Sequence, residues 1–149
     1  MKVLYDTILI ATYTGRPNRF VVTLDLNGES VIAHLPNPGR MWELLFIGVT
    51  MYIVPHDKPD AKTKYRVVGI ERDGVVIMLD TNYSNDVAQH LIENKLIPGW
   101  EEWRVVRREY TVKLHGTSSR FDLLLTNDKG DEFLLEVKSC TLFSKTGAM

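Results

Sequence analysis

The segment FDLLLTNDKGDEFLLEVK, residues 121–138, consists of two apolar runs on either side of a short polar stretch at 127–130. Each run has the length and the apolar character of a buried β-strand. A three-residue loop at 128–130 places Gly130 at the position that requires a positive φ, which glycine adopts without steric cost. The segment therefore predicts a β-hairpin in which residue 127 pairs with residue 131.

Three charged residues interrupt the apolar runs of this hairpin. The register sets Asp122 directly opposite Glu136, so that both side chains share a face with their Cβ atoms about 5 Å apart. Lys138 lies two residues beyond Glu136 and points to the same face. Two opposed carboxylates beside leucines repel each other and lose hydration, so the pair requires a cation. Either the Lys138 ammonium or a divalent metal ion supplies that charge.

Phosphodiester hydrolysis is the chemistry that fits this group of residues. A metal ion held by Asp122, Glu136 and the main-chain carbonyl of Val137 would polarise a phosphate and lower the pKa of a bound water. Lys138 would position that water or neutralise charge on the phosphate. Oxygen ligands indicate Mg²⁺ or Mn²⁺, and the single cysteine, Cys140, excludes a zinc site built from several cysteines. The alternative is a plain hairpin with a structural ion pair.

A helix and a further strand precede the hairpin. Apolar residues recur at helical spacing between Ser84 and Lys95, and Pro98-Gly99 follows the end of this pattern. Ser84 or Asn85 is expected to cap the start of the helix. Strand-like sequence resumes at 103–114, before the hairpin. A helix followed by three strands predicts a mixed α/β domain.

The first half of the chain has the pattern of a small β-barrel. Asn27-Gly28 and Asp73-Gly74 each separate two strand-like runs and are strong hairpin signals. Closing such short strands into a barrel hides their edges. The strands are expected at residues 19–26, 30–34, 50–54, 65–72 and 75–79. We therefore expect an α+β chain, with an OB-like barrel at 1–82 and the mixed α/β domain at 83–149. An SH3-like barrel is the alternative for the first domain.

Composition sets limits on location and partners. The 149 residues are 44% hydrophobic and 25% charged, which is typical of soluble globular proteins. There is no run of about 18 apolar residues and no basic leader with a cleavage site, so we expect a cytoplasmic protein without membrane association. The net charge of −1 is low for a nucleic-acid-binding protein. Any nucleic-acid surface must therefore come from local groups of cations.

The whole chain resembles the SfsA family, the sugar fermentation stimulation proteins. The matching segments run in family order from end to end, and the most specific of them is His-Leu-Pro-Asn-Pro-Gly-Arg at 34–40. They are residues 18–20, 34–41, 62–65, 96–98, 119–123 and 136–142. The resemblance implies an N-terminal OB-fold domain followed by a PD-(D/E)xK, restriction-endonuclease-like domain. It also implies DNA binding and a role in regulating sugar (maltose) metabolism.

The resemblance also assigns roles to residues of the second domain. Asp122, Glu136 and Lys138 match the nuclease motif. Glu93 on the preceding helix could supply the extra acid that some such nucleases use, although a solvent-facing charge is the favoured interpretation of this residue. Family members continue past residue 142 with a further helix and strand. The resemblance therefore implies a nuclease-like domain that is truncated at its C-terminus. Its uncovered sheet face would expose apolar surface or associate, as in a homodimer.

The barrel carries the residues expected to contact nucleic acid. Gly39 would let a backbone N–H approach a phosphate, and Arg40 would clamp that phosphate. A rigid turn whose polar groups bond each other is the alternative for this loop. The full set expected to bind nucleic acid is Arg19, His34, Asn37, Gly39, Arg40, Lys62 and Lys64. Among the aromatics, Phe20, Tyr52 and Tyr65 are either stacking platforms for bases or barrel core.

Three functions are compatible with these patterns. The first is a metal-dependent nuclease whose barrel grips single- or double-stranded DNA. The second is a non-catalytic DNA-binding regulator of sugar metabolism that keeps the nuclease fold as a scaffold. The third is a small-molecule or protein-binding module in which the charged residues form only structural ion pairs.

Overall fold

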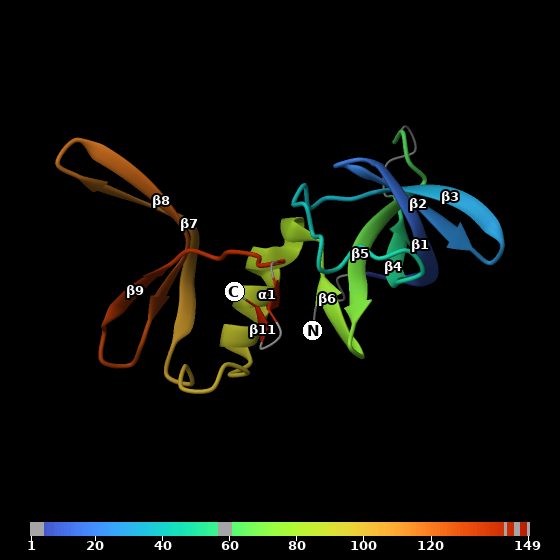
Figure 1. Ribbon diagram of the computed structural model, residues 1–149. Coiled ribbons are helices and arrows are strands. Elements are labelled where there is room, and N and C mark those ends of the chain that lie inside the picture. Colours follow the sequence, from blue (N-terminus) through green and yellow to red (C-terminus); the bar gives the residue numbers. More distant parts are fainter. Residues whose placement is uncertain (1–4, 57–60, 142, 145–146, 149) are drawn as a thin grey trace. The chain divides into compact units, whose positions relative to one another are not determined.

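The computed structural model describes residues 5–56, 61–141, 143–144 and 147–148, and its contacts divide the chain into two compact units (Figure 1). The first unit consists of Met1–Asn82 together with Cys140–Met149, and the second is Tyr83–Ser139. In this grouping the residues from Cys140 onward belong with the first unit, whereas the division expected from the sequence placed them in the second.

A five-stranded barrel is the main element of the described part of the first unit. Strands β1 to β5 form a ring in the order β3-β2-β1-β4-β5, which the parallel pairing of β3 with β5 closes. This closed ring confirms the expected OB-like barrel. A sixth strand, β6, pairs only with β5. The strands are β1 (Leu9–Asn18), β2 (Val21–Leu26), β3 (Glu29–His34), β4 (Thr50–Pro55), β5 (Tyr65–Arg72) and β6 (Val75–Met78).

Two tight turns fix the register of the barrel hairpins. Asn27 and Gly28 have φ values of 54° and 88°, and Asp73 and Gly74 have values of 51° and 76°. Two successive positive φ angles match the right-handed twist of the flanking strands, and Asn-Gly and Asp-Gly adopt them readily. Both predicted hairpins, β2–β3 and β5–β6, are confirmed.

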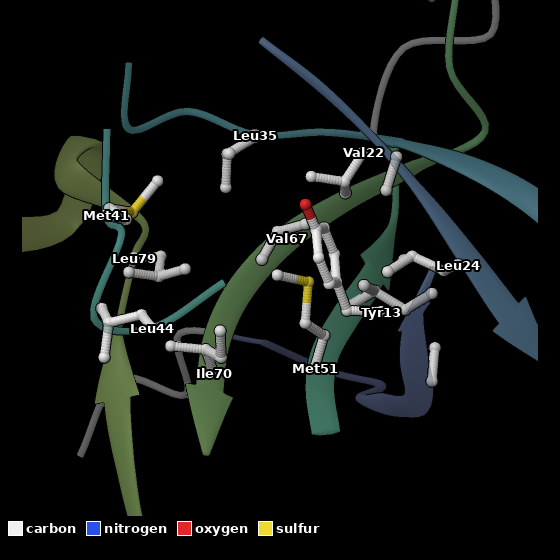
Figure 2. Packing of buried hydrophobic residues seen from close by; sticks show 13 residues of the cluster. Tyr13, Val22, Leu24, Leu35, Met41, Leu44, Met51, Val67, Ile70 and Leu79 are labelled. Atoms are coloured by element: carbon white, nitrogen blue, oxygen red, sulfur yellow. The ribbon is translucent and has the colours of Figure 1, made fainter. Parts of the chain in front are cut away.

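The barrel interior is filled by apolar side chains from every strand of the ring (Figure 2). In β1, buried Ala11 and Tyr13 alternate with exposed Thr12 and Thr14, so one face of this strand lines the core. Each fully buried Leu, Ile, Val or Met side chain contributes about 1.5–3 kcal/mol relative to exposure. The side chains labelled in Figure 2 are Tyr13, Val22, Leu24, Leu35, Met41, Leu44, Met51, Val67, Ile70 and Leu79.

The described part of the second unit is one α-helix and a three-stranded antiparallel sheet in the order β7-β8-β9. Buried Ile92 of the helix packs against Leu123 and Leu125 of β8, which builds a small core on one face of the sheet. The elements are the short 3₁₀ helix η1 (Thr81–Tyr83) at the boundary between the units, α1 (Ser84–Glu93), β7 (Arg104–Leu114), β8 (Thr117–Thr126) and β9 (Glu132–Leu135). A short pair, β10 (Phe143–Ser144) and β11 (Gly147–Ala148), belongs to the first unit.

The hairpin at 121–138 has the predicted register. Leu125 pairs with Phe133 and Thr126 with Glu132, and Gly130 has a φ of 84° in the connecting loop. The loop is held by the Asn127 side chain, whose Oδ1 accepts hydrogen bonds from the main-chain N–H groups of Lys129 and Asp131. The α1 start differs from the expectation, because neither Ser84 nor Asn85 caps it: the cap residue is Tyr83, with no side-chain cap hydrogen bond.

None of the helices in the described part of the chain is long and apolar enough to cross a membrane.

Candidate metal and nucleic-acid site

Asp122 is a half-buried acid in β8, next to the fully buried Leu123. Its Oδ2 accepts a hydrogen bond of 2.7 Å from the main-chain N–H of Val137. Its Oδ1 accepts one of 2.9 Å from the side-chain amide of Asn85, in the first turn of α1. Two N–H donors, one to each oxygen, fix both the position and the rotation of the carboxylate plane.

The pKa of Asp122 lies below its ordinary value. The hydrogen bond from the Val137 N–H is the largest cause, burial opposes it, and the Asn85 amide and the positive charges of Lys138 and Arg120 lower the pKa further. A carboxylate that accepts such bonds is stabilised in its charged form. Asp122 is therefore an anion at neutral pH, as a metal ligand must be.

The β8–β9 pairing ends beside Asp122. The last ladder pair is Leu123 with Leu135, and continuation of that register sets Asp122 opposite Glu136. The Val137 N–H donates to the Asp122 carboxylate. Beyond the last ladder pair, this side-chain hydrogen bond therefore links the two segments. Glu136 and Lys138 lie on either side of Val137 in the chain, next to this point.

Lys138 and Glu136 form an ion pair between the Nζ and Oε1 atoms. The pKa of Lys138 is raised, first by its hydrogen bond to Glu136 and by the charge of Glu136, and also by the charge of Asp122. Both side chains are exposed to solvent. The ammonium thus lies in the field of both predicted carboxylates and within reach of an incoming anion.

The donor set at this point suits a small, hard cation. Within the described residues, no three Asp, Glu, His or Cys side chains lie close enough together to hold a metal ion. Mg²⁺ does not need such a cage, because it is usually held by one or two carboxylates and completes its shell with water and substrate phosphates. The ionised Asp122, the exposed Glu136 and the carbonyl of Val137 are a donor set of that kind.

The contribution of α1 to this site comes from Asn85, which the sequence analysis treated only as a helix cap. Asn85 and Asp122 are separated by 37 residues, so no local pattern indicates the contact. The candidate extra acid, Glu93, is exposed at the last residue of α1 and accepts a hydrogen bond from Gln89 Nε2. At about 1.5 Å of rise per residue, it lies roughly 12 Å along the helix axis from Asn85.

The polar groups of the 37–40 loop of the barrel bond within the protein. Buried Asn37 accepts the Gly39 N–H on its Oδ1 at 2.9 Å. Arg16 of β1 donates from Nη1 to the carbonyls of Gly39 and Arg40, and from Nη2 to that of Arg19. The structure thus uses Gly39 and Asn37 to fix the loop. Sequence reasoning missed Arg16, whose bonds to Gly39 and Arg40 span more than twenty residues.

The side chains of Arg19 and Arg40 remain exposed while Arg16 holds their carbonyls. The Arg19 guanidinium lies 5.1 Å from the ring centre of Phe20, which is 44% exposed. Of the three aromatics considered as stacking platforms, Phe20 is thus open to solvent. Tyr52 and Tyr65 are half-buried.

The remaining cations of the predicted set lie near the β3–β5 closure. Lys62 and Lys64 are exposed, and the Lys64 carbonyl accepts the His56 N–H. The ring of half-buried His34 lies 6.5 Å from that of His56. Arg66 is not part of this surface, because it is buried and forms an ion pair with Asp80. Lys58, the other cation of this stretch, lies outside the described residues.

A closed OB-like barrel followed by a helix and a carboxylate-bearing antiparallel sheet defines a class of two-unit α+β proteins. Residues 15–79 match the family model described as the SfsA N-terminal OB domain. Residues 82–149 match the one described as the sugar fermentation stimulation protein RE domain. The chain belongs to the SfsA family.

Its relatives are sugar fermentation stimulation protein homologs. That of Clostridium acetobutylicum is 35% identical over 136 residues, covering 91% of this chain and 57% of the relative. That of Methanosphaera stadtmanae is 36% identical over 147 residues, covering 96% and 59%. A solved structure of Pyrococcus furiosus SfsA in complex with Ca²⁺ is similar with a TM-score of 0.71 and 30% identity, covering 97% of this chain and 58% of that one. The chain spans less than two thirds of the length of these proteins.

Proposed function

We propose that this chain binds DNA through its barrel and carries a divalent-metal-dependent phosphodiesterase site in its second unit, which has a restriction-endonuclease-like core. The observation that carries the proposal is the Asp122 carboxylate, fixed by two N–H donors beside the Glu136–Lys138 ion pair. A surface ion pair alone would not need an ionised acid oriented from two elements of the fold. The Ca²⁺ complex of the Pyrococcus furiosus relative supports divalent-cation binding.

Each residue of the site has a defined role in this proposal. Asp122, Glu136 and the Val137 carbonyl would hold Mg²⁺ or Mn²⁺, which supplies charge neutralisation at the phosphate and acidifies a water. Lys138 binds the phosphate and stabilises the negative charge that develops during hydrolysis. Asn85 and the Val137 N–H keep the Asp122 carboxylate ionised and oriented.

The proposed DNA surface on the barrel is formed by the exposed side chains of Arg19, Arg40, Lys62 and Lys64, with His34 beside them. Phosphate contacts by such cations release counterions, so binding must weaken as salt is added. A cytoplasmic location, where DNA is accessible, and a homodimer are further parts of the proposal. The dimer is tested by sedimentation equilibrium of the protein alone.

The proposal is tested by incubating the protein with single- and double-stranded DNA in Mg²⁺ or Mn²⁺. Asp122→Ala and Glu136→Ala should each abolish cleavage and weaken Mn²⁺ binding measured by calorimetry. Lys138→Ala should slow cleavage by about 10²–10³-fold, the usual effect of removing one electrostatic stabiliser. Glu132→Ala is the matched control, because Glu132 is an exposed acid at the start of β9, and it should leave both measurements unchanged.

Other outcomes point elsewhere. Salt-sensitive DNA binding without cleavage, in a protein that binds Mn²⁺, would favour the non-catalytic regulator of sugar metabolism. Equal cleavage by the wild type and Asp122→Ala would assign the activity to another site or to a contaminant and would refute the proposed roles.

A further inference from the structure

The β7–β8 hairpin extends beyond the three-stranded sheet as a two-stranded ribbon (Figure 1). β9 pairs with β8 only from Leu123 to Thr126. The β7–β8 ladder continues for five more residue pairs, from Tyr110 with Phe121 to Leu114 with Thr117. At about 3.4 Å per residue these five pairs span roughly 17 Å.

A tight turn closes the ribbon. His115 and Gly116 have φ values of 47° and 80°, which is the pattern of a two-residue hairpin turn whose twist matches the strands. The strands therefore pair up to the tip, and the ribbon is a defined element rather than a loop.

The two faces of the ribbon differ in chemistry. Side chains alternate along a strand, so Ser118 and Arg120 share the face of Asp122. Lys113 pairs with Ser118, and Thr111 with Arg120, so they lie on that same face. These four side chains, Thr111, Lys113, Ser118 and Arg120, are exposed and are called the ribbon face below.

The opposite face carries partly buried Tyr110, Val112 and Phe121. The ribbon is thus polar and cationic on the side of the proposed catalytic acid, and more apolar on the other.

The formal charges of the ribbon are all positive. Residues 110–121 contain no Asp or Glu. The acid at the base of the ribbon, Glu109, forms an ion pair with Arg120 at 3.0 Å. The Arg120 charge also reaches Asp122, whose pKa it helps to lower. Cations and hydroxyls therefore continue from the ribbon tip to the site.

We propose that the ribbon face binds the sugar–phosphate backbone of double-stranded DNA and leads it to Asp122. Lysine, arginine, serine and threonine side chains are the common phosphate-binding groups of DNA-binding proteins. A two-stranded ribbon fits the major groove, which is about 12 Å wide and about 8.5 Å deep. The inference rests on the proposed function, because it assumes that this chain acts on DNA.

The dimensions agree with a backbone track. From the Lys113–Ser118 pair to Asp122 the strand advances four residues, or about 13 Å. Measured along the helix axis, DNA rises about 3.4 Å per nucleotide of one strand, so the ribbon face corresponds to an axial length of roughly four nucleotides. A second copy of the chain is the poorer occupant, since like ribbon faces would bring lysine and arginine against each other.

The test is the salt dependence of binding to a DNA duplex with the metal ion chelated. Each lost phosphate contact lowers the slope of log K against log salt by about 0.9, so Lys113→Ala/Arg120→Ala should lower it by about 1.8. Lys113→Ala alone should lower it by about 0.9, and it leaves the Glu109–Arg120 pair intact. The matched control, Arg104→Ala/Lys129→Ala, removes the same charge from exposed positions on β7 and the 128–130 loop and should keep the wild-type slope.

The outcomes separate this inference from the proposed function. If the wild type binds no DNA at low salt, the proposed function and the ribbon inference both fail. If the wild type binds and the ribbon variants keep its slope, only the ribbon inference is overturned. A change in the sedimentation mass of the protein alone in Lys113→Ala would assign the ribbon to a contact between copies and would also overturn it.

Discussion

Replacing Asn85 with alanine should destabilise the second unit and release Asp122 from one of its two donors. The amide of Asn85 lies 2.9 Å from Asp122 Oδ1. A hydrogen bond to a charged group contributes about 1.5–3 kcal/mol, and the lower end applies because Asp122 is only half-buried, so we expect a loss of about 1.5 kcal/mol at pH 7. The pKa of Asp122 should rise as well, since the Asn85 amide is one of the causes that lower it.

The pH dependence of this loss is fixed by the direction of the Asp122 shift. A carboxyl whose pKa is lower in the folded than in the unfolded state stabilises the fold above the unfolded value, about 3.9. That stabilisation disappears as the pH falls through the folded pKa. The difference between the wild type and Asn85→Ala should therefore be full at pH 7 and should shrink at acid pH.

The assay is urea unfolding in EDTA at several pH values, with carboxyl NMR titration of Asp122. Asn94→Ala is the matched control: Asn94 follows the same helix, and its side-chain amide donates to the His90 carbonyl. Asn94→Ala should weaken the end of the helix and leave the Asp122 titration unchanged. An Asn85→Ala protein with the wild-type titration curve of Asp122 would refute the assigned hydrogen bond.

Three further predictions concern the packing and the loops that position the site. Leu123→Ala should lower the free energy of unfolding of the second unit by about 2–5 kcal/mol, because Leu123 is fully buried against α1. Leu134→Ala, at a site 37% exposed, should lower it clearly less. Equal losses of unfolding free energy in urea would contradict this core. Gly130→Ala should cost about 1–2 kcal/mol, because φ is 84° there and a Cβ meets nothing within 4 Å, so the cost is conformational alone; an unchanged unfolding midpoint would contradict the turn. Arg16→Ala should speed amide exchange in the 37–40 loop while the barrel core stays protected, and unchanged exchange there would show that other contacts hold the loop.

Most of the hairpins could be predicted from local sequence signals. The turns at Asn27-Gly28, Asp73-Gly74 and 128–130 lie within a few residues of the strands that they join, so the hairpins and the Asp122–Glu136 register could be predicted. A closed barrel was also expected, because short strands without covering helices have few other ways to hide their edges. Its strand set was not: the ring includes β1, which the sequence did not indicate, and leaves the expected strand at 75–79, β6, outside.

The missed features depend on contacts between distant segments. β1 was not expected as a strand, and its part through Arg16 and Pro17 is held by pairing with β2 alone, although neither residue favours a strand. β8 begins at Thr117, directly after His115-Gly116, a turn pair outside the common Asn-Gly and Asp-Gly signals. The Asn85–Asp122 hydrogen bond links a helix to a strand, and no periodicity in either element indicates it. The sequence therefore predicted the candidate acid, Asp122, but not Asn85, the residue that orients it from α1.

The parallel pairing of β3 with β5 has a kinetic consequence for the chain. The hairpins of the ring form from adjacent segments, but this pairing joins residues 32 apart in sequence, such as Ala33 and Tyr65, and the pairing of β1 with β4 joins residues 38 to 44 apart. Non-local contacts of this kind raise the contact order and slow folding, since loop-closure entropy is lost before the contact forms. Until it forms, β3 and the Tyr65–Arg66 end of β5 present unpaired edges that can recruit another chain. Ring closure is thus the step at which misassembly during synthesis competes with the native barrel.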